Sequence, residues 1–303
     1  MPADRLRVDV QGRTLELSNL DKILYPAAGF TKGEVIDYYT RVAPVLLPHL
    51  HDRALTRIRY PNGVAGNSFF EKNAPAATPP WVRVETLPAP GSTKGRETID
   101  YVLADDLPTL VWLANLAALE LHTPQWKVGE HPDLMVVDLD PGAPATLRQC
   151  CQVALLLRDR LALDGVDSYA KTSGKKGMQL SCPIAGTQDA DDVSAYARRI
   201  AQEVEREHPK LVVSRMAKNL RPGKVFIDWS QNNAAKTTVA PYSLRAQPVP
   251  SVSTPLTWDE VSAGAAGRRP SSRPFTAAEV LGRIDEYGDL LTPLLTPGPT
   301  LPV

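Results

Sequence analysis

The 303-residue sequence has only three cysteines, and no two of them stand in a Cys-x-x-Cys spacing. Structural zinc sites usually use such paired thiolates, so the spacing argues against one. Three cysteines cannot all pair with one another, and Cys150 and Cys151 are adjacent in the chain. We therefore expect reduced thiols, as in proteins of a reducing compartment.

Long hydrophobic runs are missing as well. No stretch approaches the ~20 consecutive apolar residues that span a bilayer. The first residues carry charges with no apolar run behind them, unlike a secretory signal. Hydrophobic residues still make up 43% of the chain, enough for a large folded core. We expect a cytoplasmic, nucleoid-associated protein that makes no contact with membranes.

The chain also lacks an excess of either charge, with 34 basic and 34 acidic residues. This balance argues against a protein that simply coats nucleic acid. The charges are nevertheless segregated: residues 98–146 hold eight acidic residues and one basic one, whereas residues 208–245 hold seven basic residues and one acidic one. Such patches can steer a polyanion to one face of a neutral protein.

A regular alternation of strands and helices is also absent, so we expect an α+β fold rather than a doubly wound sheet. Apolar patterns predict helices at 17–25, 34–47, 107–122, 146–163 and 189–208. They predict strands at 54–60, 81–87, 98–103, 134–140, 166–171, 178–184, 211–214 and 225–230, with a hairpin-like tip at 91–95. Many of the 28 prolines follow residue 241, which suggests wrapping loops and a frayed C-terminus.

The first candidate site is an Asp-Leu-Asp sequence at the end of an apolar run. Side chains two positions apart on a strand point to the same face, so Asp138 and Asp140 would converge. Close carboxylates repel each other unless a cation lies between them, and hard oxygen ligands suit Mg²⁺ or Mn²⁺. A solvated pair at a strand-to-turn junction is the alternative, and for an isolated Asp-x-Asp it is the more common case.

A second carboxylate interrupts another apolar run. Asp228 is the single acidic residue of the most basic part of the chain. It is either paired, with Arg221 or Lys224 as candidate partners, or it is a metal ligand. Three carboxylates on strands, surrounded by basic residues, are typical of two-metal phosphoryl transfer.

A glycine- and lysine-rich turn separates two predicted strands at residues 171–177. It lacks the first glycine and the Lys-Ser/Thr ending of a Walker loop. It still offers backbone N–H groups, two hydroxyls and several ammonium groups, which suit a phosphate chain. A plain turn with solvated lysines is the alternative.

Other residues give weaker signals. His122 ends a predicted buried helix, where it could simply cap the C-terminus. Phe69 and Phe70 lie near basic residues, as in proteins that stack single-stranded bases, although core packing is the alternative. Asn19, Lys22 and Lys32 flank two predicted helix starts, and helix N-termini favour anions.

Taken in order, these segments resemble the primase-polymerase domain of bacterial ligase D, a member of the archaeo-eukaryotic primase superfamily that acts in non-homologous end joining. The resemblance covers about residues 15 to 290. It rests on Ser18-Asn-Leu-Asp-Lys-Ile-Leu-Tyr-Pro, Thr31-Lys, Arg59-Tyr-Pro-Asn-Gly, Phe69-Phe-Glu-Lys, His122-Thr-Pro-Gln-Trp, Asp138-Leu-Asp-Pro-Gly, Thr172-Ser-Gly-Lys-Lys-Gly, Lys224-Val-Phe-Ile-Asp-Trp-Ser-Gln-Asn and Ala240-Pro-Tyr-Ser-Leu-Arg.

The resemblance implies a primase-polymerase fold with a mixed or antiparallel sheet flanked by helices. It implies one domain over residues 1–290, with an N-terminal helical part that binds a 5′-phosphate (1–52), a catalytic core (53–250) and a C-terminal wrap (251–290). A proline-rich tail would follow at 291–303.

The resemblance also implies roles for single residues. Asp138, Asp140 and Asp228 would be catalytic and hold two Mn²⁺ or Mg²⁺ ions. His122, Ser173, Lys176 and Arg245 would bind the NTP or dNTP, with ribonucleotides preferred. Asn19, Lys22 and Lys32 would bind the DNA 5′-phosphate, Phe69 and Phe70 the template, and Arg221 would lie in a regulatory loop near the metals.

The implied activity is nucleotide addition to primer 3′ ends at short gaps or at double-strand-break ends. The implied partners are DNA that is gapped, 5′-phosphorylated or has 3′ overhangs, a separate or fused DNA ligase, and an end-binding protein. No Lys-x-Asp-Gly ligase motif occurs, so this chain alone should not seal a nick. A non-catalytic DNA end-binding module is the alternative. An Asp-based phosphohydrolase is disfavoured because Gly142 stands where a Thr or Val would be required.

Overall fold

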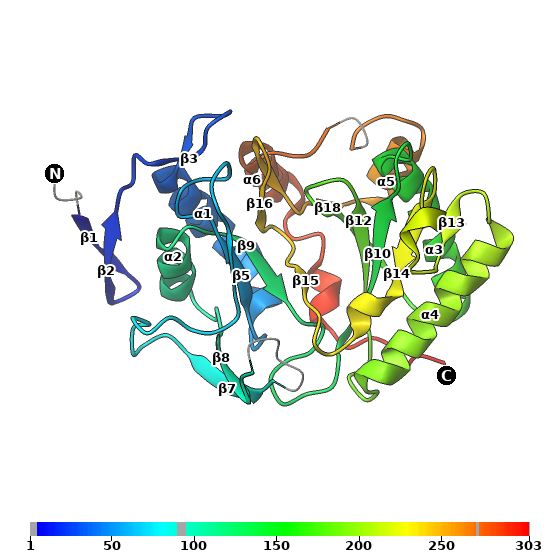
Figure 1. Cartoon of the computed structure of the whole chain (residues 1–303), viewed down its shortest axis with the longest axis horizontal. Coiled ribbons are helices and arrows are strands. Elements are labelled where there is room, and N and C mark those ends of the chain that lie inside the picture. Colours follow the sequence, from blue (N-terminus) through cyan, green and yellow to red (C-terminus); the bar gives the residue numbers. More distant parts are fainter. Residues whose placement is uncertain (1–4, 90–94, 271–272, 303) are drawn as a thin grey trace.

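The computed structural model describes residues 5–89, 95–270 and 273–302. Two separate sheets form its centre (Figure 1). The larger has the order β13-β14-β10-β12-β11-β18 and is antiparallel except between β13 and β14. Its strands are β13 (Val212–Val213), β14 (Val225–Asp228), β10 (Leu134–Pro141), β12 (Met178–Pro183), β11 (Tyr169–Thr172) and β18 (Pro255–Leu256).

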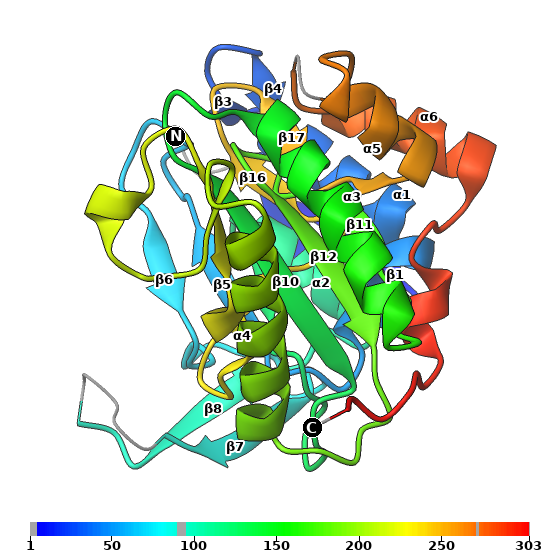
Figure 2. The same ribbon diagram turned by 90° about the vertical axis from the view of Figure 1, so that its right-hand side faces the viewer.

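Two long helices cover one face of this sheet. They are α3 (Leu147–Leu163) and α4 (Ala190–Glu207), which Figure 2 shows lying across β10 and β12. The buried side chains of α4 recur every three or four residues, at Val193, Ala197, Ile200 and Val204. This is the spacing of one helix face, so burial of that face holds α4 on the sheet.

The smaller sheet has the order β15-β9-β5-β6. Its strands are β15 (Thr238–Val239), β9 (Ala118–Thr123), β5 (Thr56–Arg59) and β6 (Phe69–Glu71). Helices α1 (Lys32–Leu50) and α2 (Leu107–Asn115) pack against each other beside it. The Tyr39 hydroxyl of α1 donates to the Leu119 carbonyl of β9, which ties the helix to the sheet.

Short hairpins and helices complete the fold. The hairpins are β1 (Arg5–Val10) with β2 (Arg13–Ser18), β3 (Ile23–Tyr25) with β4 (Phe30–Thr31), β7 (Val84–Pro88) with β8 (Thr98–Val102), and β16 (Leu244–Ala246) with β17 (Pro250–Val252). The remaining helices are α5 (Trp258–Ala265), α6 (Ala277–Tyr287), η1 (Lys218–Leu220), η2 (Trp229–Asn232) and η3 (Thr292–Leu295). None of the described helices is long and apolar enough to cross a membrane.

The structure confirms the α+β class and much of the predicted element order. Thr31 and Glu34 form the capping box that opens α1. The three cysteines, all within the described residues, are buried and unpaired, as expected. Residues 91–94 of the expected hairpin-like tip lie outside the described residues.

The predicted helix at 107–122 is wrong in its second half. Helix α2 ends at Asn115, Ala117 has a φ of 56°, and Ala118–Thr123 forms strand β9. A left-handed residue cannot continue a right-handed helix, so the chain turns there. His122 therefore lies on a strand and does not cap a helix.

The predicted helix at 17–25 is also wrong. These residues are the end of β2, a turn in which Asn19 has a φ of 53°, and strand β3. Leu15 and Leu17 are buried while Thr14 and Glu16 are exposed, which is the period of two that marks a strand. Residues 5–52 therefore contain four strands and one helix, and are not mainly helical.

The C-terminus is packed where a frayed end was expected. Leu294 and Leu301 are buried, and the Leu301 N–H donates to the side-chain carbonyl of Gln188 at 2.7 Å. Segment 292–302 thus folds back beside β12 and Ile184, which replaces the expected loose tail with ordered structure.

Candidate active site

A cavity of about 410 Å³ lies where the two sheets meet. Residues of β10 and β12 from the larger sheet and of β9 and β15 from the smaller sheet line it. The lining consists of His122, Asp138, Asp140, Ser173, Lys175, Lys176, Gly177, Gln179, Gln231, Thr237, Thr238, Val239, Arg245 and Gln247. Six residues predicted from widely separated segments are therefore neighbours here: His122, Asp138, Asp140, Ser173, Lys176 and Arg245.

Strand register explains how the acidic residues meet. Asp138 and Asp140 lie two positions apart on β10, and Asp138 is the direct antiparallel partner of Asp228 on β14. Directly paired residues project to the same face of a sheet. All three carboxylates are therefore on one face, as predicted for the first pair and for Asp228.

The three carboxylates repel one another. Burial and the negative charge of Asp140 raise the pKa of Asp138, and Asp228 acts in the same direction. Burial and Asp228 also raise the pKa of Asp140, against the opposing effect of the Arg221 guanidinium. A cation between these side chains would relieve this cost.

Asp228 is held by neighbours on its own segment. Its Oδ1 accepts from the Ser230 N–H at 3.1 Å, its Oδ2 accepts from Gln231 Nε2 at 2.8 Å, and Lys236 Nζ lies 4.0 Å away. The predicted alternative partners bond elsewhere in the described chain: Arg221 donates to the Met216 carbonyl and Lys224 to the Pro209 carbonyl. Arg221 and Lys224 are therefore not the partners of Asp228, whose ion pair within the described residues is the contact with Lys236.

Asp138, Asp140 and Asp228, here called the acidic cluster, offer the type of donor atom that a hard divalent cation binds. Its members are carboxylate oxygens on adjacent strands, the ligands that Mg²⁺ and Mn²⁺ prefer. Among the described residues, no three His, Cys, Asp or Glu side chains already converge as a complete metal site. Both Asp228 oxygens accept hydrogen bonds from Ser230 and Gln231, so Asp228 would exchange these partners to ligate an ion.

The turn between β11 and β12 has the tight form that a phosphate loop needs. The Ser173 Oγ accepts from the N–H groups of Lys175 at 3.3 Å and Gly177 at 3.2 Å. Gly174 has a φ of 70°, and a Cβ there would lie 2.6 Å from Arg245 Cγ. At Gly177 a Cβ would lie 2.2 Å from the Leu139 carbonyl oxygen. Both positions require glycine, so the turn is locked against Arg245 and β10 and is not a loose surface turn.

A buried lysine below this turn was not predicted. Lys171 Nζ donates to the Val239 carbonyl at 2.8 Å, to Ser253 Oγ at 2.9 Å and to Gln179 Oε1. Gln179 in turn hydrogen-bonds to Asp138 and lowers its pKa. Burial, with a smaller effect of Arg245, lowers the pKa of Lys171 to about 7. Lys171 therefore fixes the orientation of a side chain that contacts the acidic cluster.

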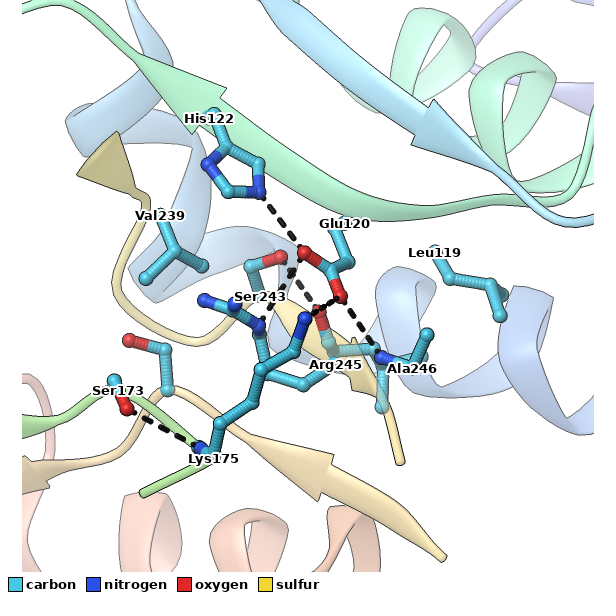
Figure 3. Close-up of polar contacts among 12 residues, drawn as sticks. Leu119, Glu120, His122, Ser173, Lys175, Val239, Ser243, Arg245 and Ala246 are labelled. Carbon is cyan, nitrogen blue, oxygen red and sulfur yellow. Dashed lines mark hydrogen bonds and ion pairs between the residues drawn. The ribbon is translucent and has the colours of Figure 1, made fainter. Parts of the chain in front are cut away.

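Glu120 is a second site residue that the sequence did not reveal. It is fully buried on β9, and its carboxylate lies 3.0 Å from His122 Nε2, 3.0 Å from Lys175 Nζ and 3.4 Å from Arg245 Nε (Figure 3). It also accepts from the Ala246 N–H at 3.1 Å. These partners outweigh the effect of burial and lower the pKa of Glu120 to about 2. The alternation Leu119-Glu120-Leu121-His122 signals a strand with two polar residues on one face, but the predicted helix concealed it.

The residues predicted to bind a 5′-phosphate form a separate group. The Lys22 N–H donates to the Asn19 carbonyl at 3.1 Å, and Lys22 Nζ donates to Asn62 Oδ1 at 3.1 Å. Lys32 Nζ donates to the Ser18 carbonyl at 2.6 Å. Burial and the nearby charge of Lys22 lower the pKa of Lys32 to about 8. The structure thus brings two lysines together here, beside the start of α1.

Phe69 and Phe70 are on the surface. They lie on the edge strand β6 and are 49% and 57% exposed, so they are not core residues. Arg221 follows η1, and its guanidinium carbon lies 3.7 Å from the Phe226 ring centre. Phe226 pairs with Asp140 across the sheet, which places Arg221 near the acidic cluster.

Comparison with known proteins agrees with this geometry. A family model described as the LigD primase-polymerase domain matches residues 31–291. The chain is 44% identical over 284 residues to a multifunctional non-homologous end joining protein LigD from Mycolicibacterium smegmatis, covering 92% of this chain and 36% of that protein. It is 34% identical over 277 residues to a bifunctional LigD from Bacillus subtilis, covering 90% of this chain and 43% of that protein.

The structural comparison extends over nearly the whole chain. The polymerase domain of Mycobacterium tuberculosis ligase D, solved in complex with DNA, matches with a TM-score of 0.87 and 41% identity. The match covers 94% of this chain and 99% of that one. A domain of this type uses a nucleotide substrate, depends on divalent metal ions in general, and adds nucleotides in DNA repair. The chain therefore belongs to the LigD primase-polymerase domain family and is a nucleotidyltransferase.

Proposed function

We propose that this chain is a template-dependent polymerase that adds nucleotides, preferentially ribonucleotides, to primer 3′ ends at short gaps or double-strand-break ends in DNA. One observation carries the proposal: a single cavity is lined both by strand-borne carboxylates and by a tight hydroxyl- and lysine-bearing turn. The turn suits the triphosphate, and the carboxylates suit the metal ions that phosphoryl transfer requires beside it.

The nucleotide would lie along the cavity from sugar to triphosphate. Ser173, Lys176 and Arg245 would hold the triphosphate, and Lys175, which also lines the cavity, would join them. His122 would contact the sugar. The primer 3′-hydroxyl would then attack the α-phosphate, forming the new phosphodiester bond while pyrophosphate leaves with the electron pair of the broken bond.

Asp138, Asp140 and Asp228 would hold two Mn²⁺ or Mg²⁺ ions, whose chemistry when bound is to activate the attacking hydroxyl and to neutralise charge on the triphosphate. The raised pKa values of Asp138 and Asp140 support this role, since repelling carboxylates favour a cation. Gln179 would orient Asp138 through the hydrogen bond that it already makes, and Ser230 and Gln231 would hold Asp228 until it exchanges them for an ion.

The DNA contacts are proposed from surface chemistry. Asn19, Lys22 and Lys32 would bind the 5′-phosphate on the downstream side of a gap. Phe69 and Phe70 would stack on template bases, which their exposure permits. Arg221 would adjust the acidic cluster from its loop.

The wider setting is also part of the proposal. The chain spans 36% and 43% of the length of the two LigD proteins described above, so their whole activity does not transfer to it directly. We infer that it works at the nucleoid in the cytoplasm, beside a fused or separate DNA ligase and a DNA-end-binding protein.

Primer extension on a short 5′-phosphorylated gap tests the function. The assay compares Mn²⁺ with Mg²⁺ and NTP with dNTP, and the expected result is metal-dependent addition with NTP favoured. Lys22→Ala should weaken binding to phosphorylated gaps and leave unphosphorylated gaps unaffected. A purely end-binding protein would bind the same DNA without extending it, and Asp138→Ala would then leave binding unchanged.

A further inference from the structure

Among the described residues, several carboxylates contact the residues that line the cavity. Glu120 is the one whose neighbours are cations and not other acids. It is fully buried, and its partners come from three places: His122 on its own strand β9, Lys175 on the turn between β11 and β12, and Arg245 on β16 (Figure 3). It thus links the smaller sheet to the turn that the nucleotide's phosphates are proposed to occupy. The protein can bury this carboxylate because its nearest side-chain partners are cations or neutral groups.

The contact with His122 determines which ring nitrogen carries a proton. A carboxylate with a pKa of about 2 is ionised and can only accept, so the His122 Nε2 atom must be the donor across the 3.0 Å contact. Burial lowers the pKa of His122, which favours a ring with one proton near neutral pH. The proton is then on Nε2, and Nδ1 keeps a lone pair.

The lone pair at Nδ1 of His122 would bind a hydroxyl group in preference to a C–H group. His122 lines the cavity, so its second nitrogen is available to a group bound there. An acceptor nitrogen recognises a hydroxyl hydrogen and gains nothing from a C–H group. A ribose and a deoxyribose differ in one hydroxyl, and a site built to bond a hydroxyl rejects the analogue that lacks it.

The other two contacts restrain the phosphate end. Lys175 Nζ and Arg245 Nε lie 3.0 and 3.4 Å from the same carboxylate, and Arg245 is 8% exposed. One rigid anion therefore sets the spacing between the sugar-facing ring and two phosphate-facing cations. Fixed spacing of binding groups raises the fraction of bound nucleotides that are correctly positioned.

We propose that Glu120 is a positioning residue for ribonucleotide selection: it holds His122 as the Nε2–H tautomer, leaving Nδ1 to accept from a sugar hydroxyl, and it fixes Lys175 and Arg245 at the phosphate end. The proposal rests on the nucleotide site described above. A purely structural ion-pair cluster is the competing explanation, and it predicts no effect on the sugar.

The first measurement is the nitrogen NMR spectrum of His122 in the wild-type chain at pH 7.5, without nucleotide. The expected pattern is a protonated Nε2 and an unprotonated Nδ1. A protonated Nδ1 in the free wild-type protein would overturn the proposal, whether or not any variant folds and whether or not the chain is a polymerase.

The second measurement uses Glu120→Gln, which keeps the shape and removes the charge. Titration calorimetry with ATP and dATP, without primer, should show that the affinity ratio of ATP to dATP falls about tenfold, the value of roughly one hydrogen bond. The nitrogen spectrum should show a mixture of His122 tautomers. An unchanged ratio and an unchanged tautomer would make Glu120 purely structural.

Glu203→Gln is the matched control. Glu203 also pairs with two arginines, Arg160 and Arg199, but on α3 and α4. It should leave the ATP to dATP ratio and the His122 spectrum unchanged, and an equal effect of both variants would contradict the proposal. If the wild type bound neither nucleotide, the proposed function would fail, while the tautomer measurement would still decide the role of Glu120.

Discussion

Two sets of carboxylates in opposite electrostatic states contact the residues that line the cavity. Asp138, Asp140 and Asp228 face one another, and repulsion together with burial raises the pKa of the first two. Glu120 faces His122, Lys175 and Arg245, and its pKa is lowered to about 2. The nearby cations do not offset the repulsion within the acidic cluster, whereas the charge of Glu120 is offset by its partners. The first group suits a bound cation, and the second suits a fixed part of the framework.

The largest effect is expected from substitutions that remove a carboxylate of the acidic cluster. Asp138→Ala or Asp228→Ala should lower the rate of nucleotide addition by at least about a thousandfold, since the positions of the metal ions are lost. Primer extension measures the rate, and circular dichroism verifies the fold. Addition at the full rate by either variant would refute the assignment. In metal-free buffer Asp138→Asn should not lower Tm, because it removes a repulsive charge, and added Mn²⁺ should raise Tm in the wild type only.

Glu120→Gln should have the opposite effect on stability. The substitution leaves Lys175 and Arg245 facing a buried neutral group, so we expect a loss of about 3 kcal/mol in the free energy of unfolding. Urea denaturation in metal-free buffer measures it beside Asp138→Asn. Equal stability changes in Glu120→Gln and Asp138→Asn would show that the two sets of carboxylates do not differ in their electrostatic state.

A smaller effect concerns the lysines that are proposed to bind a 5′-phosphate. Because the pKa of Lys32 is lowered to about 8, its charge is present at pH 7 and mostly lost at pH 9. The preference for 5′-phosphorylated over unphosphorylated gaps should therefore fall roughly tenfold between these pH values. Fluorescence anisotropy measures it, and Lys32→Arg should remove the pH dependence. If the preference of the wild type for phosphorylated gaps stayed constant with pH, Lys32 would not be the residue that recognises the 5′-phosphate.

The smallest effect is expected at the exposed aromatic pair. Phe69→Ala and Phe70→Ala should each weaken binding to a template overhang about fivefold, through lost stacking. Tm should stay unchanged because both rings are about half exposed. If either variant had a much lower Tm but kept its affinity for the template, the two phenylalanines would have a structural role and would not bind the template.

The pair of Asp138 and Asp140 could be predicted because its signal is local. An apolar run ending in Asp-Leu-Asp predicts a strand, and strand geometry places both carboxylates on one face. The pairing of Asp138 with Asp228 depends on strand register, which no single segment encodes. It could be inferred only from the family resemblance.

Glu120 could not be predicted for a related reason. The segment from 107 to 122 is rich in Leu and Ala, which favour helices, and the break at Ala117 depends on a left-handed backbone that Ala rarely adopts. Lys171 was missed because its buried partners come from β12, β15 and the segment after β17. Both residues are recognisable only once distant strands are placed side by side.

The packed C-terminal segment has a practical consequence for shortening the chain. A protein cut after residue 290 would keep every residue of the cavity but would lose two buried leucines, Leu294 beside Ile184 and Leu301 beside Gln188. The uncovered apolar surface would promote self-association in solution. A truncated preparation could therefore be inactive through aggregation while its catalytic groups were intact.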